Sequence, residues 1–108
     1  MIEINKILDE VRVLGCSDLH FTVGIAPVVR LNGSLRKLSS YPVMDEEAIV
    51  DIVDQMVTDK QKRSIVNRVD TDFSFLTRRG YRHRVNVYFQ RGSTAIAIRL
   101  LRNDIPTL

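Results

Sequence analysis

The chain opens with apolar residues spaced as on one face of a helix. Within residues 4–14 these positions are Ile4, Ile7, Leu8, Val11 and Leu14. A spacing of three or four residues predicts an amphipathic helix. Gly15 is a suitable end for it, because glycine readily adopts the positive φ that often follows a helix.

Strict alternation of apolar and polar residues follows, which is typical of strands. The segment DLHFTV (18–23) predicts a half-buried strand. The next two apolar segments, PVVRL and SLRKL, flank Asn32-Gly33, a dipeptide that favours a two-residue β-hairpin turn. We interpret Arg30 and Arg36, on either side of this turn, as surface charges only.

The middle of the chain predicts two helices with recognisable N-terminal caps. Asp45 is an expected N-cap, and the buried stripe behind it is Ile49, Ile52, Val53 and Met56. Thr58 and Gln61 fit a capping box for a shorter, peripheral helix that reaches about Asn67.

The last third of the chain predicts three strands, at about 72–75, 81–90 and 94–101. The apolar face of the second is odd-numbered and that of the third is even-numbered. The element order is therefore helix, three strands, two helices, three strands. This order predicts an α+β fold with an antiparallel, PAS-like sheet of about six strands and helices packed on one side. We expect residues 1–103 to form this domain and residues 104–108 to begin a linker.

Charge is segregated along the chain, which has 16 basic and 13 acidic residues and a formal net charge of +3. Residues 78–102 contain seven arginines and no acid, whereas acids concentrate at 45–59. A basic end of this kind indicates an anionic partner: phosphate, nucleic acid, acidic lipid or an acidic protein face.

The register of the last two strands predicts where two of these arginines lie. A two-residue turn at 91–92 pairs Gln90 with Ser93, and the same register places Arg84 directly opposite Arg99. Like charges opposed on a sheet cost roughly 0.2–1 kcal/mol. Two adjacent guanidinium groups nevertheless suit a polyoxyanion, because each offers planar, bidentate donors. A solvated basic face with no ligand remains the alternative.

Several classes of function lack support in the sequence. The five glycines match no phosphate-binding P-loop, and GxSxG, HExxH and CxxC motifs do not occur. Cys16 is the only cysteine and predicts a small, partly buried thiol. His20 is expected to be structural, and Asp70 and Asp72 a solvated edge without metal. The N-terminal segment lacks a signal-peptide core and apolar runs are short, which favours the cytoplasm without membrane insertion.

Three segments carry a resemblance to a known family. SDLHFTVGIAPVVRLNGSLRKL (17–38), DTDFSF (70–75) and RHRVNVYFQRGSTAIAIRLLRNDIPTL (82–108) resemble the N-terminal domain of the type IV pilus retraction ATPases. These twitching-motility proteins are a branch of the secretion ATPase superfamily. The resemblance covers essentially the whole chain.

This resemblance implies a domain of a hexameric motor that lies at the cytoplasmic face of the inner membrane, at the base of the pilus. Its partners would be RecA-like motor domains of the same and neighbouring subunits. ATP, with Mg²⁺, would lie between the two kinds of domain, and hydrolysis would rotate them and withdraw pilin subunits. The chain itself needs no cofactor. Without a Walker A motif, it is expected not to hydrolyse ATP alone.

The resemblance also assigns candidate residues. Arg84 and Arg99 match the arginines that contact nucleotide phosphates, and Arg82 and Arg91 are second choices. His83 replaces the aromatic residue usual between the first two arginines of the motif. Two other functions remain open: a small nucleic-acid-binding module in which Tyr88 stacks on a base, and a PAS-type sensor of small molecules.

Overall fold

A computed structural model describes residues 2–101, which form three helices and six strands. The elements are α1 (Ile4–Val13), β1 (Asp18–Phe21), β2 (Val28–Leu31), β3 (Ser34–Lys37), α2 (Glu46–Asp54), α3 (Asp59–Val66), β4 (Thr71–Leu76), β5 (Arg82–Gln90) and β6 (Ser93–Leu100). Their order confirms the predicted α+β class. The expected linker at 104–108 lies outside the described residues.

All six strands form one antiparallel sheet in the order β3-β2-β1-β6-β5-β4. The last strand of the chain, β6, therefore lies at the centre, between β1 and β5. Leu19 of β1 is directly opposite Ile98 of β6. This long-range pairing joins the N-terminal hairpin to the C-terminal strands in a single sheet.

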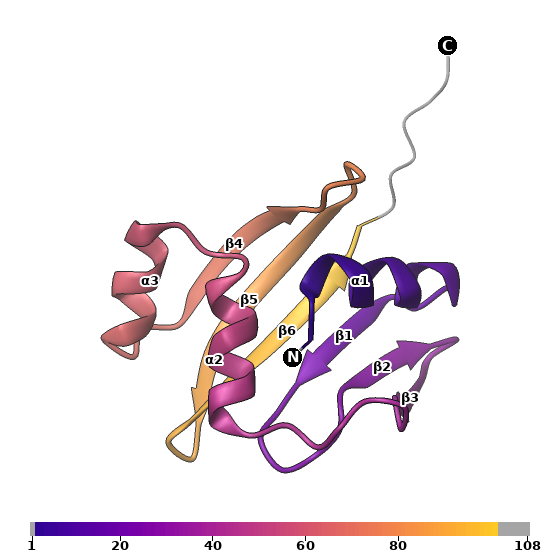
Figure 1. Ribbon diagram of the computed structural model, residues 1–108, viewed down its shortest axis with the longest axis horizontal. Helices are drawn as coiled ribbons and strands as arrows, with labels where there is room; N and C mark the ends of the chain where they lie inside the picture. Colours follow the sequence, from indigo (N-terminus) through magenta and orange to yellow (C-terminus); the bar gives the residue numbers. More distant parts are fainter. Residues whose placement is uncertain (1, 102–108) are drawn as a thin grey trace.

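The described helices lie on one face of the sheet, as Figure 1 shows. α1 and α2 cross this face, and α3 lies near β4 at one side. The core fills the space between helices and sheet, and Leu19, Phe21 and Ile96 are fully buried there. We call the opposite side of the sheet the open face. Its residues include Asp18, His20, Arg30, Asp72, Arg82, Arg84, Asn86, Tyr88, Ala97 and Arg99.

α2 and α3 begin at the N-caps predicted from the sequence. The Asp45 carboxylate accepts a hydrogen bond from the backbone N–H of Ala48 at 2.8 Å. Thr58 and Gln61 form the complete capping box at the start of α3. Within α3 only Ile65 is buried, so this helix is peripheral, as its thin apolar content predicts.

Both two-residue turns have the conformation that their register requires. φ is positive at Asn32 (51°) and Gly33 (79°), and again at Arg91 (50°) and Gly92 (78°). Two consecutive positive φ values are typical of turns whose twist matches that of a hairpin. The second turn fixes the pairing of Gln90 with Ser93 and, with it, every pair between β5 and β6.

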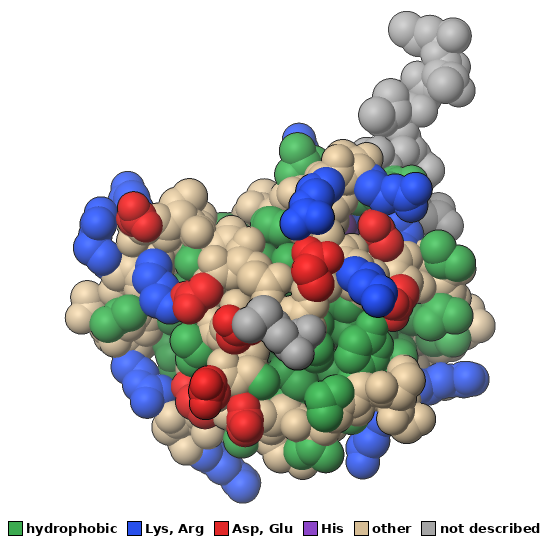
Figure 2. Space-filling view, viewed as in Figure 1, with side chains coloured by type: hydrophobic (Ala, Val, Ile, Leu, Met, Phe, Trp, Pro, Cys, Tyr) green, Lys and Arg blue, Asp and Glu red, His purple; other side chains and the backbone are tan. Residues whose placement is uncertain are grey.

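Figure 2 shows the helix-bearing face, where acidic side chains gather over α2 while lysines and arginines lie mostly around the outline. The acids along this helix and its cap are Asp45, Glu46, Glu47, Asp51 and Asp54. Among residues 2–101, none of the helices has the length and apolar character to cross a bilayer.

Candidate functional site

Arg84 and Arg99 are directly opposite each other on the open face, in the register predicted from the sequence. The pairing continues across the sheet. Asp18 of β1 is opposite both Arg99 and Arg30, and Ser74 of β4 is opposite Arg84. A single row of residues therefore carries three arginines and one carboxylate across five strands.

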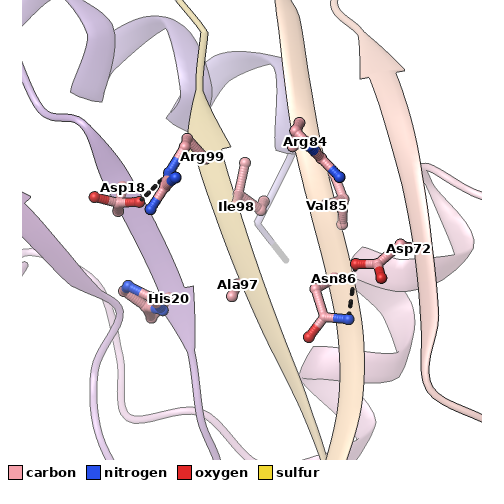
Figure 3. Close-up of a pocket in the computed structure, with 9 residues that line it drawn as sticks. All are labelled: Asp18, His20, Asp72, Arg84, Val85, Asn86, Ala97, Ile98 and Arg99. Atoms are coloured by element: carbon pink, nitrogen blue, oxygen red, sulfur yellow. Dashed lines mark hydrogen bonds and ion pairs between the residues drawn. The ribbon is translucent and has the colours of Figure 1, made fainter.

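A shallow pocket of about 250 Å³ lies over the two paired arginines (Figure 3). Its lining comes from β1, β4, β5 and β6: Asp18, His20, Asp72, Arg84, Val85, Asn86, Ala97, Ile98 and Arg99. The two guanidinium groups lie on the same side of the sheet, but Figure 3 shows them pointing away from each other. Arg99 turns toward Asp18, and Arg84 turns to the opposite side. Mutual repulsion between two like charges explains this divergence.

Asp18 is the ion-pair partner of the site, and sequence reasoning missed it. Its Oδ1 accepts from Nε of Arg99 at 3.4 Å, and its Oδ2 lies 3.7 Å from Nε of Arg30. The hydroxyl of Ser17 also donates to Oδ2, at 2.7 Å. Arg30 is exposed on the surface, as predicted, and its Nε also lies near the Asp18 carboxylate. Alternation already placed Asp18 on the polar face, but its position beside Arg99 depends on the β1–β6 pairing.

The side of the pocket next to β4 is polar but leaves Arg84 without a counter-ion. Asp72 accepts a hydrogen bond from the amide of Asn86 at 3.0 Å. Within residues 2–101, no hydrogen bond or ion pair engages the guanidinium of Arg84. Asp72 is thus part of the pocket wall as well as part of the sheet edge.

The second-choice arginines occupy different places. Arg82 is opposite Leu76 on the open face, two residues from Arg84 along β5. Arg91 is in the β5–β6 turn, seven residues from Arg84, or roughly 20 Å along an extended strand. It lines a separate depression with Gln90 and Ser93. Arg82 can share a ligand with Arg84, whereas Arg91 cannot reach the same small anion.

His83 points into the interior between the flanking arginines of β5 and is fully buried. Its Nε2 lies 3.2 Å from Nη2 of Arg12, and its Nδ1 lies 3.4 Å from the carbonyl oxygen of Phe75. A guanidinium only donates, so Nε2 accepts and Nδ1 carries the proton. Burial, and next the charge of Arg12, lower the pKa of His83. This histidine is structural and has no part in the open face.

The remaining candidates add no catalytic constellation. Cys16 is buried, and burial raises the pKa of its thiol, which makes it unreactive. In the described range 2–101, no three His, Cys, Asp or Glu side chains are placed to hold a metal ion. His20 lies at the pocket rim opposite Ala97. Among the described residues, the open face therefore presents arginine side chains whose planar donors suit an oxyanion.

A nucleic-acid interface is less well supported by this face. Tyr88 contributes its one aromatic side chain among the described strand residues, and it is opposite Ala95. Asp18 and Asp72 place negative charge in the same area. Single-strand binding sites combine a basic groove with several aromatic stacking surfaces, and this combination does not occur along the described strands.

Comparison with known proteins shows similarity to ATPases of type IV pili. No protein-family model matches the chain. It is 26% identical over 107 residues to the type IV pilus retraction ATPase PilT of Pseudomonas aeruginosa, and 27% identical to the type IV pilus ATPase PilU of the same organism. These matches cover 99% of the chain but only 31% and 28% of the two relatives. The chain thus spans less than a third of the length of either protein.

Solved structures show the same correspondence. The pilus retraction motor PilT, solved with bound ADP, superimposes with a TM-score of 0.87 at 35% identity, covering 98% of this chain and 31% of that one. The ATPase DotB of Legionella pneumophila shares the fold, with a TM-score of 0.77 at 19% identity over 96% of this chain and 30% of its own. In sequence and in fold, the chain has the features of an N-terminal domain of the PilT ATPase family.

Proposed function

We propose that this domain contributes Arg84 and Arg99 to the terminal phosphates of ATP in a hexameric type IV pilus retraction ATPase. The nucleotide would be held mainly by a RecA-like motor domain, and the open face would close over its phosphates. Arg82 would support the same contact from the next position on β5, and Arg91 would contact a motor-domain surface. Movement of this domain against the motor domains would accompany each turnover at the cytoplasmic face of the inner membrane.

The observation that carries this proposal is the direct pairing of Arg84 with Arg99 on a face without a covering helix in the described residues. Sheets avoid like charges in directly opposed positions, because each such pair is destabilising by roughly 0.2–1 kcal/mol. An anion placed between the two groups changes this repulsion into attraction. Two guanidinium groups also offer several donors in fixed planes, which suits phosphate oxygens better than a single point charge.

The residues present fit the phosphate part of a nucleotide and no more. The sequence lacks a P-loop, so the nucleoside and the Mg²⁺ would be bound by the motor domain. When bound, ATP supplies the phosphoanhydride bond that is hydrolysed. Arg84 and Arg99 would offset negative charge at the terminal phosphates and orient them, which is an electrostatic role. The chain alone is therefore expected to show negligible ATP hydrolysis.

Alanine substitutions in the full-length protein test the assignment. We expect Arg84→Ala and Arg99→Ala each to lower the rate of ATP hydrolysis at least about tenfold, because a preorganised charge contact is lost. Arg36→Ala is the matched control. Arg36 is exposed on β3 and is opposite the buried Val29, so it projects from the other side of the sheet. Circular dichroism should show an unchanged fold in all three variants.

The outcomes separate the candidate residues. A smaller loss of ATP hydrolysis in Arg82→Ala and Arg91→Ala would support a secondary role for these two arginines. Wild-type turnover in both Arg84→Ala and Arg99→Ala would exclude the phosphate role. Robust hydrolysis by the chain alone, in a preparation free of motor domains, would contradict the requirement for a second domain.

A further inference from the structure

We infer that Asp18 is an internal counter-ion that competes with phosphate for Arg99 and so sets the affinity of the open face for anions. This inference rests on the proposed function of Arg84 and Arg99. It adds a residue that determines how readily that site is occupied.

Asp18 lies directly beside Arg99, where its carboxylate can compete with an anion for the guanidinium. It is between Arg30 and Arg99 in one row of paired residues, while Arg84 lies on the far side of Arg99. Arg99 therefore has a carboxylate on one side and a like charge on the other. Both influences move its guanidinium toward Asp18, and Figure 3 shows it in that position.

The carboxylate is held in place more firmly than the arginine. The Asp18 side chain is only 13% exposed, whereas that of Arg99 is 71% exposed. The Ser17 hydroxyl donates to one carboxylate oxygen at 2.7 Å, and Nε of Arg30 lies 3.7 Å from the same oxygen. A bound anion would therefore displace the exposed arginine from Asp18, and the carboxylate would stay where it is.

An anion shared by Arg84 and Arg99 has to draw the two guanidinium groups together. They point apart in this structure, so the Arg99 guanidinium has to turn toward Arg84 for both to reach one phosphate group. This turn moves its Nε away from Asp18, which it contacts at 3.4 Å. Loss of the ion pair between Asp18 and Arg99 lowers the affinity of the open face for the anion. An ion pair at the surface, with one exposed partner, typically changes an equilibrium about two- to fivefold.

The substitution Asp18→Asn tests this directly, because it keeps the shape of the side chain and removes the charge. The probe is inorganic triphosphate, titrated into the 108-residue chain in 150 mM salt and followed by the ¹⁵N–¹H signals of the arginine Nε groups. We expect the dissociation constant of Asp18→Asn to be about two- to fivefold lower than that of the wild type.

Asp72→Asn is the matched control. Asp72 lines the same pocket and its loss changes the net charge equally, but its carboxylate bonds to Asn86 and to no arginine within residues 2–101. We expect Asp72→Asn to change the dissociation constant by less than about twofold, since only a screened longer-range interaction is altered. Without triphosphate, the Arg99 Nε signal should shift in Asp18→Asn and stay in place in Asp72→Asn.

Each other result overturns the inference in a recognisable way. Equal tightening in both variants would mean that only net charge matters. Weaker binding in Asp18→Asn would make Asp18 a residue that orients Arg99 for the anion. In either case triphosphate still binds and the phosphate role of the arginines stands. Failure of every variant, wild type included, to bind triphosphate would overturn the competition, because the open face would then have no anion affinity for Asp18 to set. The phosphate role would still be decided by ATP hydrolysis in Arg84→Ala and Arg99→Ala.

Discussion

Replacement of His83 by phenylalanine should remove a specific loss of stability in acid. His83 is fully buried, and its Nε2 accepts from the Arg12 guanidinium at 3.2 Å. The folded protein can keep these contacts only while the ring is neutral. Burial and the charge of Arg12 accordingly lower the pKa of His83 below its ordinary value of 6.5.

The sign and size of the effect follow from linkage between protonation and folding. As pH falls below about 6.5, the unfolded chain takes up a proton at His83 that the folded chain does not, so the free energy of unfolding decreases. This stability is fully present above the unfolded pKa. For one proton, the loss between pH 7.5 and pH 5.5 is at most about 1.4 kcal/mol.

Urea unfolding at these two pH values measures the loss. With a slope of about 1–3 kcal/mol/M, the wild-type midpoint should fall by at most about 0.5–1.4 M more than that of His83→Phe. His20→Gln is the control histidine variant, because His20 lies on the open face, and it should behave as the wild type. An equal acid-induced loss in His83→Phe and the wild type would show that the buried ring is not its source.

Two further substitutions test the elements that position the sheet. Asp45→Ala removes the side chain that accepts from the Ala48 N–H, and it should lower the free energy of unfolding by about 1 kcal/mol; an unchanged urea midpoint would show that water replaces the cap. Thr94→Val removes a hydroxyl that donates to Glu46 at 2.6 Å and ties α2 to β6, and it should cost about 1 kcal/mol in thermal or urea unfolding. If Thr94→Val is as stable as the wild type, the hydrogen bond from the backbone N–H of Thr94 to the Glu46 carboxylate is sufficient to connect α2 to β6.

Local sequence patterns are sufficient for the elements and for two strand pairings, β2 with β3 and β5 with β6. Asn32-Gly33 has a clear turn signature, and the opposite parity of the apolar faces at 81–90 and 94–101 restricts their register. For that reason the pairing of Arg84 with Arg99 is confirmed in the structure. The cap at Asp45 and the box at Thr58 and Gln61 are equally local and are also confirmed.

Contacts between distant parts of the chain could not be predicted in this way. Alternation shows which face Asp18 occupies, but it does not show which strand lies beside β1. The pairing of β1 with β6 brings together residues about 80 positions apart, and only that pairing makes Asp18 a partner of Arg99. The contact of Arg12 with His83 has the same origin, because it forms across the core between α1 and β5.

A crystal structure of this domain joined to its proposed motor domain, with a non-hydrolysable ATP analogue bound, would show whether Arg84 and Arg99 contact the phosphates. We predict guanidinium nitrogens of Arg84 and Arg99 at about 2.7–2.9 Å from terminal phosphate oxygens, with Arg99 withdrawn from Asp18. A closed, nucleotide-bound structure in which both arginines lie in solvent, and other residues alone contact the phosphates, would contradict it.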